Sequence, residues 1–149
     1  MTTRRFLTPP MRDVHARLTR LMEAASYYGP VDDLKFTTKL VDVKDGDKRF
    51  VDVELLIATN RLKITPTGDG RLSATMNFAV LCGDADRKDV GQLWESKNII
   101  VPANRLDEIK TTGVPVTLRV SVRQAPKYVK VIAYDYGSDL VGSTTKVMR

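Results

Sequence analysis

The hydrophobic pattern of this chain changes its period once, at Gly29-Pro30, and that change limits the folds that the chain can adopt. In residues 11–28 the apolar side chains recur every three or four positions, as on an amphipathic helix. After Pro30, apolar and polar residues alternate, as in half-buried β-strands. We therefore expect a flexible lead-in over residues 1–10, an amphipathic helix over residues 11–28 and a β domain over residues 31–149.

The alternating part divides into about eight short segments separated by turns rich in Gly, Pro and Asp. Each segment has one apolar face, and the segments recur about every dozen residues, which favours two antiparallel sheets packed on one core. The fold class predicted from the residues is therefore mainly β, an antiparallel β-sandwich. One or two helical turns are expected over residues 103–110. The expected strands cover residues 34–43, 50–58, 62–65, 71–82, 93–101, 116–123, 128–136 and 140–148.

The single cysteine and single histidine among 149 residues exclude several kinds of site. An intramolecular disulfide and a zinc site built from several Cys and His ligands are both impossible. A Cys–His nucleophile pair would have to use Cys82 and His15. Cys82 ends the apolar face of its strand, as a buried structural cysteine does, and His15 has no orienting acid on its helix face. No catalytic residue is predicted.

The loop over residues 83–91 is the candidate metal site of the sequence. Calcium requires about six to eight oxygen ligands, and this loop offers three carboxylates, from Asp84, Asp86 and Asp89. Arg87 and Lys88 lie among them and oppose a divalent cation. A solvated hairpin loop is therefore the favoured interpretation, and no metal or cofactor is predicted.

The net charge of +6 comes from an excess of basic residues near both ends of the chain. On the strand over residues 128–136, Lys130, Tyr134 and Tyr136 share one face by parity. If the strand over residues 116–123 is its neighbour, Arg119 and Arg123 complete an aromatic and basic surface. Such a surface suits a protein partner, a polyanion or single-stranded nucleic acid; the alternative is a sheet face half-covered by the helix. The predicted binding surface is thus Arg119, Arg123, Lys130, Tyr134 and Tyr136.

The last third of the chain resembles a known family. The segment Tyr-Val-Lys-Val-Ile-Ala-Tyr-Asp over residues 128–135, a turn and then Val-Gly-Ser are similar to the C-terminal immunoglobulin-like region of bacterial von Willebrand factor A-related proteins, of the type abundant in acidobacteria. The likeness extends over residues 18–148, although the metal-binding Asp-x-Ser-x-Ser segment of a factor A domain is absent. The matching residues are Tyr128, Lys130, Val131, Ala133, Asp135, Val141, Gly142 and Ser143.

The resemblance implies an immunoglobulin-like sandwich that serves as an accessory module of a larger exported or surface protein. We therefore expect a non-catalytic protein-interaction module with a protein partner, and not an enzyme. The alternative is a small basic protein that binds nucleic acid or another polyanion. The sequence has no apolar run of the ~18 residues that a membrane span needs and no secretory signal. An exported or envelope location is expected for a piece of a longer protein, and a cytoplasmic one if Met1 is the native start.

Overall fold

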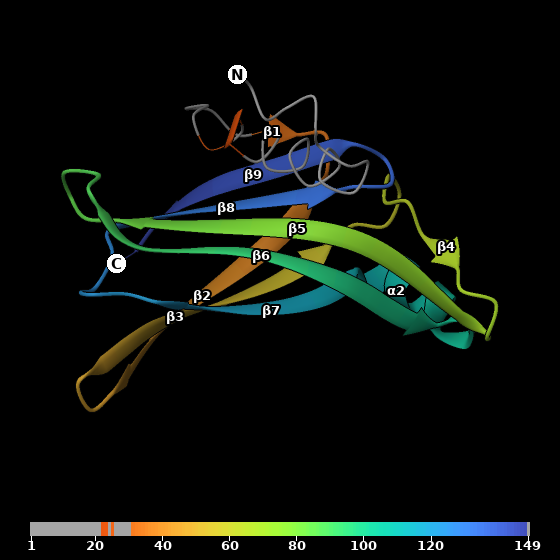
Figure 1. Ribbon diagram of the computed structural model, residues 1–149, viewed down its shortest axis with the longest axis horizontal. Coiled ribbons are helices and arrows are strands. Elements are labelled where there is room, and N and C mark those ends of the chain that lie inside the picture. Colours follow the sequence, from red (N-terminus) through yellow and green to blue (C-terminus); the bar gives the residue numbers. More distant parts are fainter. Residues whose placement is uncertain (1–21, 24, 26–30, 149) are drawn as a thin grey trace, which may run out of the picture.

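The computed structural model describes residues 22–23, 25 and 31–148, and these residues form two facing antiparallel sheets (Figure 1). The smaller sheet has the order β2-β3-β7: β2 (Phe36–Asp45), β3 (Lys48–Ile57) and β7 (Val114–Ser121). In the larger sheet the order is β1-β9-β8-β5, and β5 also pairs with β4 and β6. Its strands are β1 (Val31–Asp32), β4 (Thr65–Pro66), β5 (Arg71–Gly83), β6 (Asp89–Pro102), β8 (Tyr128–Asp135) and β9 (Leu140–Val147).

The main core lies between the two sheets and follows the alternation in the sequence. Along β7 the burial pattern alternates strictly, and Val116, Leu118 and Val120 face inward. Opposite them, β5 contributes Met76 and Phe78, which are fully buried. Burial of one such side chain stabilises the fold by about 1.5–3 kcal/mol. The mainly β, antiparallel, sandwich-like architecture predicted from the residues is thus confirmed.

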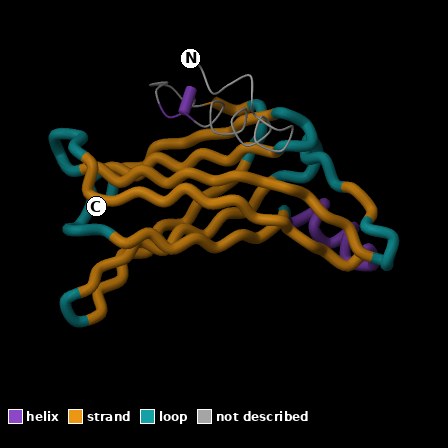
Figure 2. The backbone as a smooth tube through the Cα atoms, viewed as in Figure 1, coloured by secondary structure: helices purple, strands orange, loops and turns teal. Residues whose placement is uncertain are grey.

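Turns and one short helical segment connect the strands as the sequence predicts in most places. The β2–β3 hairpin turns at Gly46, whose φ of 59° suits glycine. Between β6 and β7, η2 (Ala103–Arg105) and α2 (Leu106–Thr112) confirm the helical turns expected over residues 103–110. Figure 2 shows this helical segment at the end of the sandwich opposite the β2–β3 hairpin, where the chain passes from the larger to the smaller sheet.

The prediction of a strand over residues 62–65 is wrong. The structure has only Thr65–Pro66 in a strand there, paired with Leu72 and Ser73 of β5. The backbone N–H of Lys63 is used elsewhere, because it donates to the carboxylate of Asp135 at 2.7 Å. Pro66 has no N–H to continue a ladder. The segment is therefore fixed by a side chain rather than by sheet pairing.

A second, smaller apolar cluster covers the outer face of the larger sheet. Its buried members come from β5, β8 and β9, and Ala25 packs against them. These members are Ala79, Ile132, Tyr134 and Val141. Apart from Met22, Glu23 and Ala25, which are helical, the predicted lead-in over residues 1–10 and the helix over residues 11–28 lie outside the described residues. No helix in the described part of the chain has the length and apolar composition needed to cross a membrane.

Candidate functional site: a basic pocket on the larger sheet

The structure does not bring the five predicted surface residues together. The prediction assumed that the strands over residues 116–123 and 128–136 are neighbours, but β7 pairs with β3, and β8 pairs with β5 and β9. The assumed adjacency is wrong because the chain crosses between the sheets after β7. There, the N–H of Val122 donates to the carbonyl of Arg49, and the N–H of Arg123 donates to the carbonyl of Val90. Arg119 therefore lies on a different sheet from Lys130 and Tyr134.

Arg119 and Arg123 already have acidic partners within the described chain. The guanidinium of Arg119 donates twice to the carboxylate of Asp52, at 2.6 and 2.8 Å, and lies 4.8 Å from the centroid of the Phe50 ring. The hydrogen bond from Arg119 holds the pKa of Asp52 below its usual value. Arg123 is 3.9 Å from the carboxylate of Asp89 and also donates to the carbonyl of that residue.

Lys130 and Tyr134 lie on the outer face of the larger sheet, and Tyr136 follows the end of β8. Tyr134 is only 3% exposed, and its hydroxyl donates to Oδ1 of Asp139 at 2.7 Å. Lys130 is half-buried, and its ammonium donates to the carbonyl of Ala25 at 3.2 Å. Burial lowers the pKa of Lys130. Of the five predicted residues, Lys130 is the one that lines a pocket on this face.

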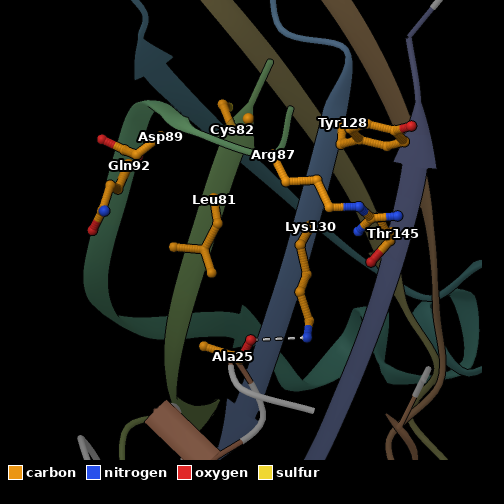
Figure 3. Close-up of a pocket in the computed structure, with 10 residues that line it drawn as sticks. Ala25, Leu81, Cys82, Arg87, Asp89, Gln92, Tyr128, Lys130 and Thr145 are labelled. Atoms are coloured by element: carbon orange, nitrogen blue, oxygen red, sulfur yellow. Dashed lines mark hydrogen bonds between the residues drawn. The ribbon is translucent and has the colours of Figure 1, made fainter. Parts of the chain in front are cut away.

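This pocket has a volume of about 500 Å³ and lies beside the loop between β5 and β6 (Figure 3). The strand register places four of its residues in one row across the sheet, because Leu81 faces both Gln92 and Lys130, and Lys130 faces Thr145. The full lining is Ala25, Leu81, Cys82, Gly83, Arg87, Asp89, Gln92, Tyr128, Lys130 and Thr145. The row thus combines an apolar floor with neutral hydrogen-bonding groups and a cation.

Arg87 enters the pocket from the β5–β6 loop, and no pattern in the sequence indicates this role. Its Cζ atom lies 4.5 Å from the centroid of the Tyr128 ring, and Figure 3 shows its side chain reaching across the pocket toward Thr145. A guanidinium over an aromatic face is a cation–π contact worth about 0.5–1 kcal/mol at an exposed site. The parity of β8 predicts that Tyr128 shares a face with Lys130, whereas the position of Arg87 in a loop predicts no face for its side chain.

The carboxylates of the same loop serve the loop itself. Oδ1 of Asp84 accepts the N–H of Asp86 at 2.8 Å and the N–H of Lys88 at 3.0 Å, which is the chemistry of an Asx turn. Asp89 faces Arg123. Among the described residues, no group of three or more His, Cys, Asp or Glu side chains could hold a metal ion. His15, the other candidate from the sequence, lies outside the described residues.

Cys82 lies with its side chain in the core, as its place in the sequence predicts. Only 2% of the residue is exposed. Burial, together with the negative charge of Asp89, raises the pKa of the Cys82 thiol to about 11. At neutral pH the sulfur is therefore a protonated thiol, which is a poor nucleophile.

We expect native Cys82 to react with a thiol reagent such as DTNB at least about a hundredfold more slowly at pH 8 than in the urea-unfolded chain, because the thiolate fraction falls by that factor. The same shift makes stability depend on pH. The unfolded thiol loses its proton near pH 9 and the folded one near pH 11, so stability falls as pH rises through that interval. A Cys82→Ala variant should lack this component in urea titrations. Equal labelling rates for the native and unfolded chain would contradict the buried position.

The fold and the site together define a β-sandwich with a small basic pocket on one outer face. Neither a scan of protein-family models nor a search of curated proteins finds a match to this chain.

Proposed function

We propose that this chain is a non-catalytic protein-interaction module that binds a partner at the pocket beside the β5–β6 loop. The observation that carries the proposal is the joint presence there of Arg87, Tyr128 and Lys130 around an apolar floor formed by Leu81. Arg and Tyr side chains in concave, partly desolvated positions are typical of the few residues that dominate protein–protein binding. Trp94, which is 39% exposed, lies two residues along β6 from the pocket residue Gln92.

We further propose that the sandwich is of the immunoglobulin-like type. Without the two-residue strands β1 and β4, the remaining seven strands can be lettered A, B, C, C′, E, F and G in chain order. In immunoglobulin-type domains A, B and E pair in one sheet, and C, F and G pair in the other. The orders β2-β3-β7 and β6-β5-β8-β9 support this type, because they correspond to A-B-E and C′-C-F-G.

From the resemblance to von Willebrand factor A-related proteins we also propose that the module serves a larger exported or surface protein. An immunoblot of fractionated source cells tests this part. A band well above 16.7 kDa in an envelope or secreted fraction is the expected result. A band of that size in the cytosol would contradict export and leave a free-standing small adaptor.

Reversing the charge of Lys130 should abolish partner binding. We expect a protein that co-purifies with the wild-type chain to be lost from Lys130→Glu and weakened in Lys130→Met, which keeps the aliphatic stem but lacks the ammonium. Removal of one charged contact at the centre of an interface costs about 2 kcal/mol or more, or about thirtyfold in affinity. Quantitative affinity purification from source-cell extract, followed by biolayer interferometry with the purified partner, measures the loss.

Lys110→Glu is the matched control, because Lys110 is exposed on α2 at the other end of the sandwich (Figure 1). A photo-crosslinking residue at Thr145, which lines the pocket, should form an adduct with the same partner. The same residue at the exposed Thr117 of β7, on the other sheet, should not. Partner binding that survives in Lys130→Glu, or equal adducts from both positions, would exclude this face as the interface.

The second candidate function is binding of nucleic acid or another polyanion, and the net charge of +6 favours it. Such binding requires several unengaged cations along one surface, and its affinity falls steeply with salt. The pairing of Arg119 with Asp52 and of Arg123 with Asp89 counts against it. Elution from heparin below about 0.2 M salt would argue against this function, while retention beyond about 0.5 M salt would support it.

A further inference from the structure

Arg87 differs in its partners from the six other arginines in residues 31–148. Each of the others donates through its guanidinium to a carboxylate or to a backbone carbonyl: Arg49, Arg61, Arg71, Arg105, Arg119 and Arg123. The guanidinium of Arg87 lies over the Tyr128 ring, and within the described part of the chain it has no ion pair or hydrogen-bond acceptor. All five of its N–H groups are therefore open to solvent or to a ligand as far as the described residues are concerned.

The loop holds Arg87 in an unusual backbone conformation. Its φ is 63°, in the left-handed region that non-glycine residues rarely adopt. Asp84 stabilises this turn by accepting the backbone N–H of Arg87 at its carbonyl, at 2.9 Å, and those of Asp86 and Lys88 at its carboxylate. Residues held in this region by their surroundings cluster at functional sites, although they also occur in ordinary turns. The loop thus fixes the backbone from which the Arg87 side chain extends over the Tyr128 ring.

The charged residues that line the pocket sum to a net positive charge, which is complementary to one carboxylate. Two cations, Arg87 and Lys130, and one anion, Asp89, line it, and Asp89 is already paired with Arg123. Gln92 and Thr145 add neutral hydrogen-bonding groups. A volume of about 500 Å³ lies within the range of small-ligand sites, so one or two side chains of a partner can enter.

We infer that this pocket binds the carboxylate of a glutamate or aspartate side chain in an acidic segment of the partner protein. The carboxylate accepts a two-point hydrogen bond from the Arg87 guanidinium beside the Tyr128 ring, while the aliphatic part of the ligand packs on Leu81. This inference rests on the proposed interaction function and names the chemistry of its partner. A planar carboxylate matches the fork of a guanidinium, and the pairing of Arg119 and Arg123 with acidic residues removes two arginines from any basic row that a polyanion could follow.

The chain supplies its own reporter for this binding. Trp94 is its single tryptophan, and the indole N–H of Trp94 donates to Oε1 of the pocket residue Gln92 at 2.8 Å. Titration with a capped penta-glutamate peptide should therefore change the Trp94 emission saturably. The penta-glutamine peptide, equal in length but uncharged, should give no saturable change.

Two substitutions of Arg87 separate charge from geometry. Arg87→Asn removes the cation while Asn tolerates the left-handed backbone, and we expect the affinity for penta-glutamate to fall about tenfold or more. Arg87→Lys keeps the charge but loses the fork, and we expect a loss of about threefold to fivefold. Lys110→Gln, which removes one charge from α2, should bind as the wild type does. Thermal unfolding of each variant checks that the fold is intact.

Three results would overturn the inference: equal binding of the glutamine peptide, an Arg87→Asn variant with unchanged affinity, or no saturable change at all. A response that heparin or oligothymidylate reproduces, with equal loss in Arg87→Asn and Lys110→Gln, would assign the charge to a polyanion surface instead. The captured partner distinguishes the carboxylate anchor from the proposed interaction site. A partner that is lost from Lys130→Glu but stays bound to Arg87→Asn would refute the carboxylate anchor alone, whereas a partner unaffected by both would refute the interaction site itself.

Discussion

Replacing Asp135 with alanine is expected to lower the free energy of unfolding by about 4 kcal/mol, a large share of the roughly 5–15 kcal/mol that stabilises a domain. Asp135 is fully buried. Its Oδ2 accepts the N–H of Lys63 at 2.7 Å and the hydroxyl of Ser138 at 2.7 Å, and its Oδ1 faces the N–H of Gly137 at 3.3 Å. Alanine would leave the two backbone N–H donors without their acceptor in a part-buried site.

The loss should appear in urea unfolding followed by Trp94 fluorescence, and as a fall in Tm of about 10 °C. Two milder variants test the cause. Asp135→Asn keeps one acceptor oxygen and should cost about half as much, while Ser138→Ala removes one donor and should cost about 1 kcal/mol. If Asp135→Ala were no less stable than Ser138→Ala, the carboxylate would not be what fixes residues 62–64 against the end of β8.

The sequence was sufficient to predict which residues face the core, because burial along a strand depends on a local alternation. Val51 and Val53 of β3, like Val116 and Leu118 of β7, are buried as the period of two predicts. The hairpin at Gly46 was predictable for the same reason, since a turn residue acts on its immediate neighbours.

Which strands pair with each other in a sheet could not be predicted in this way. The few residues between β7 and β8 contain Ala125-Pro126, which is equally compatible with a hairpin and with a crossing between two sheets. Long-range hydrogen bonds, such as that from the N–H of Val122 to the carbonyl of Arg49, decide between them. The binding surface predicted from Arg119 to Tyr136 therefore divided between the two sheets.

The candidate site was predictable only at Lys130 and Tyr128, because parity along their strand places both on one face. Arg87 reaches the pocket because its backbone adopts φ 63° inside a turn held by Asp84. Nothing in the residue type Arg signals a left-handed conformation. Its stacking partner, Tyr128, is forty-one positions later in the chain. A site made by one loop residue and one strand from another part of the sheet needs the folded structure to be recognised.

Two of the residues that carry the family resemblance have structural roles. Asp135 fixes the segment before β4 to the end of β8, and Gly142 lies where β9 passes close to the chain before β2. The motif therefore reports on how such a sandwich is assembled. These two residues therefore explain packing, while the proposal for binding rests on Arg87, Lys130 and Tyr128.

Gly142→Ala is the second substitution with a large expected effect. A methyl group on this residue would overlap the carbonyl oxygen of Leu34 and lie 2.9 Å from its carbonyl carbon. It would also lie 3.0 Å from Cε1 of Phe36. Leu34 is 1% exposed, and its N–H donates to the carbonyl of Val141 at 3.2 Å, so this backbone has little room to retreat. We expect a loss of about 3 kcal/mol or more, since overpacking against a fixed core costs about 1–3 kcal/mol or more.

Gly83→Ala is the matched control, because Gly83 also lies in a strand of the larger sheet but a methyl group there would meet its neighbours at 3.5 Å, an ordinary contact. Its effect should stay within about 1 kcal/mol, and the lower entropy of the unfolded chain acts in its favour. Urea unfolding of both variants measures the difference, and amide exchange at Leu34 locates it. Equal stability of the two variants would mean that the backbone of Leu34 can shift, and that close approach is not the reason for a glycine in β9. A loss of stability in Gly142→Ala but not in Gly83→Ala would show that the backbone of β9 packs directly against the backbone of Leu34, just before β2, with no side chain between them.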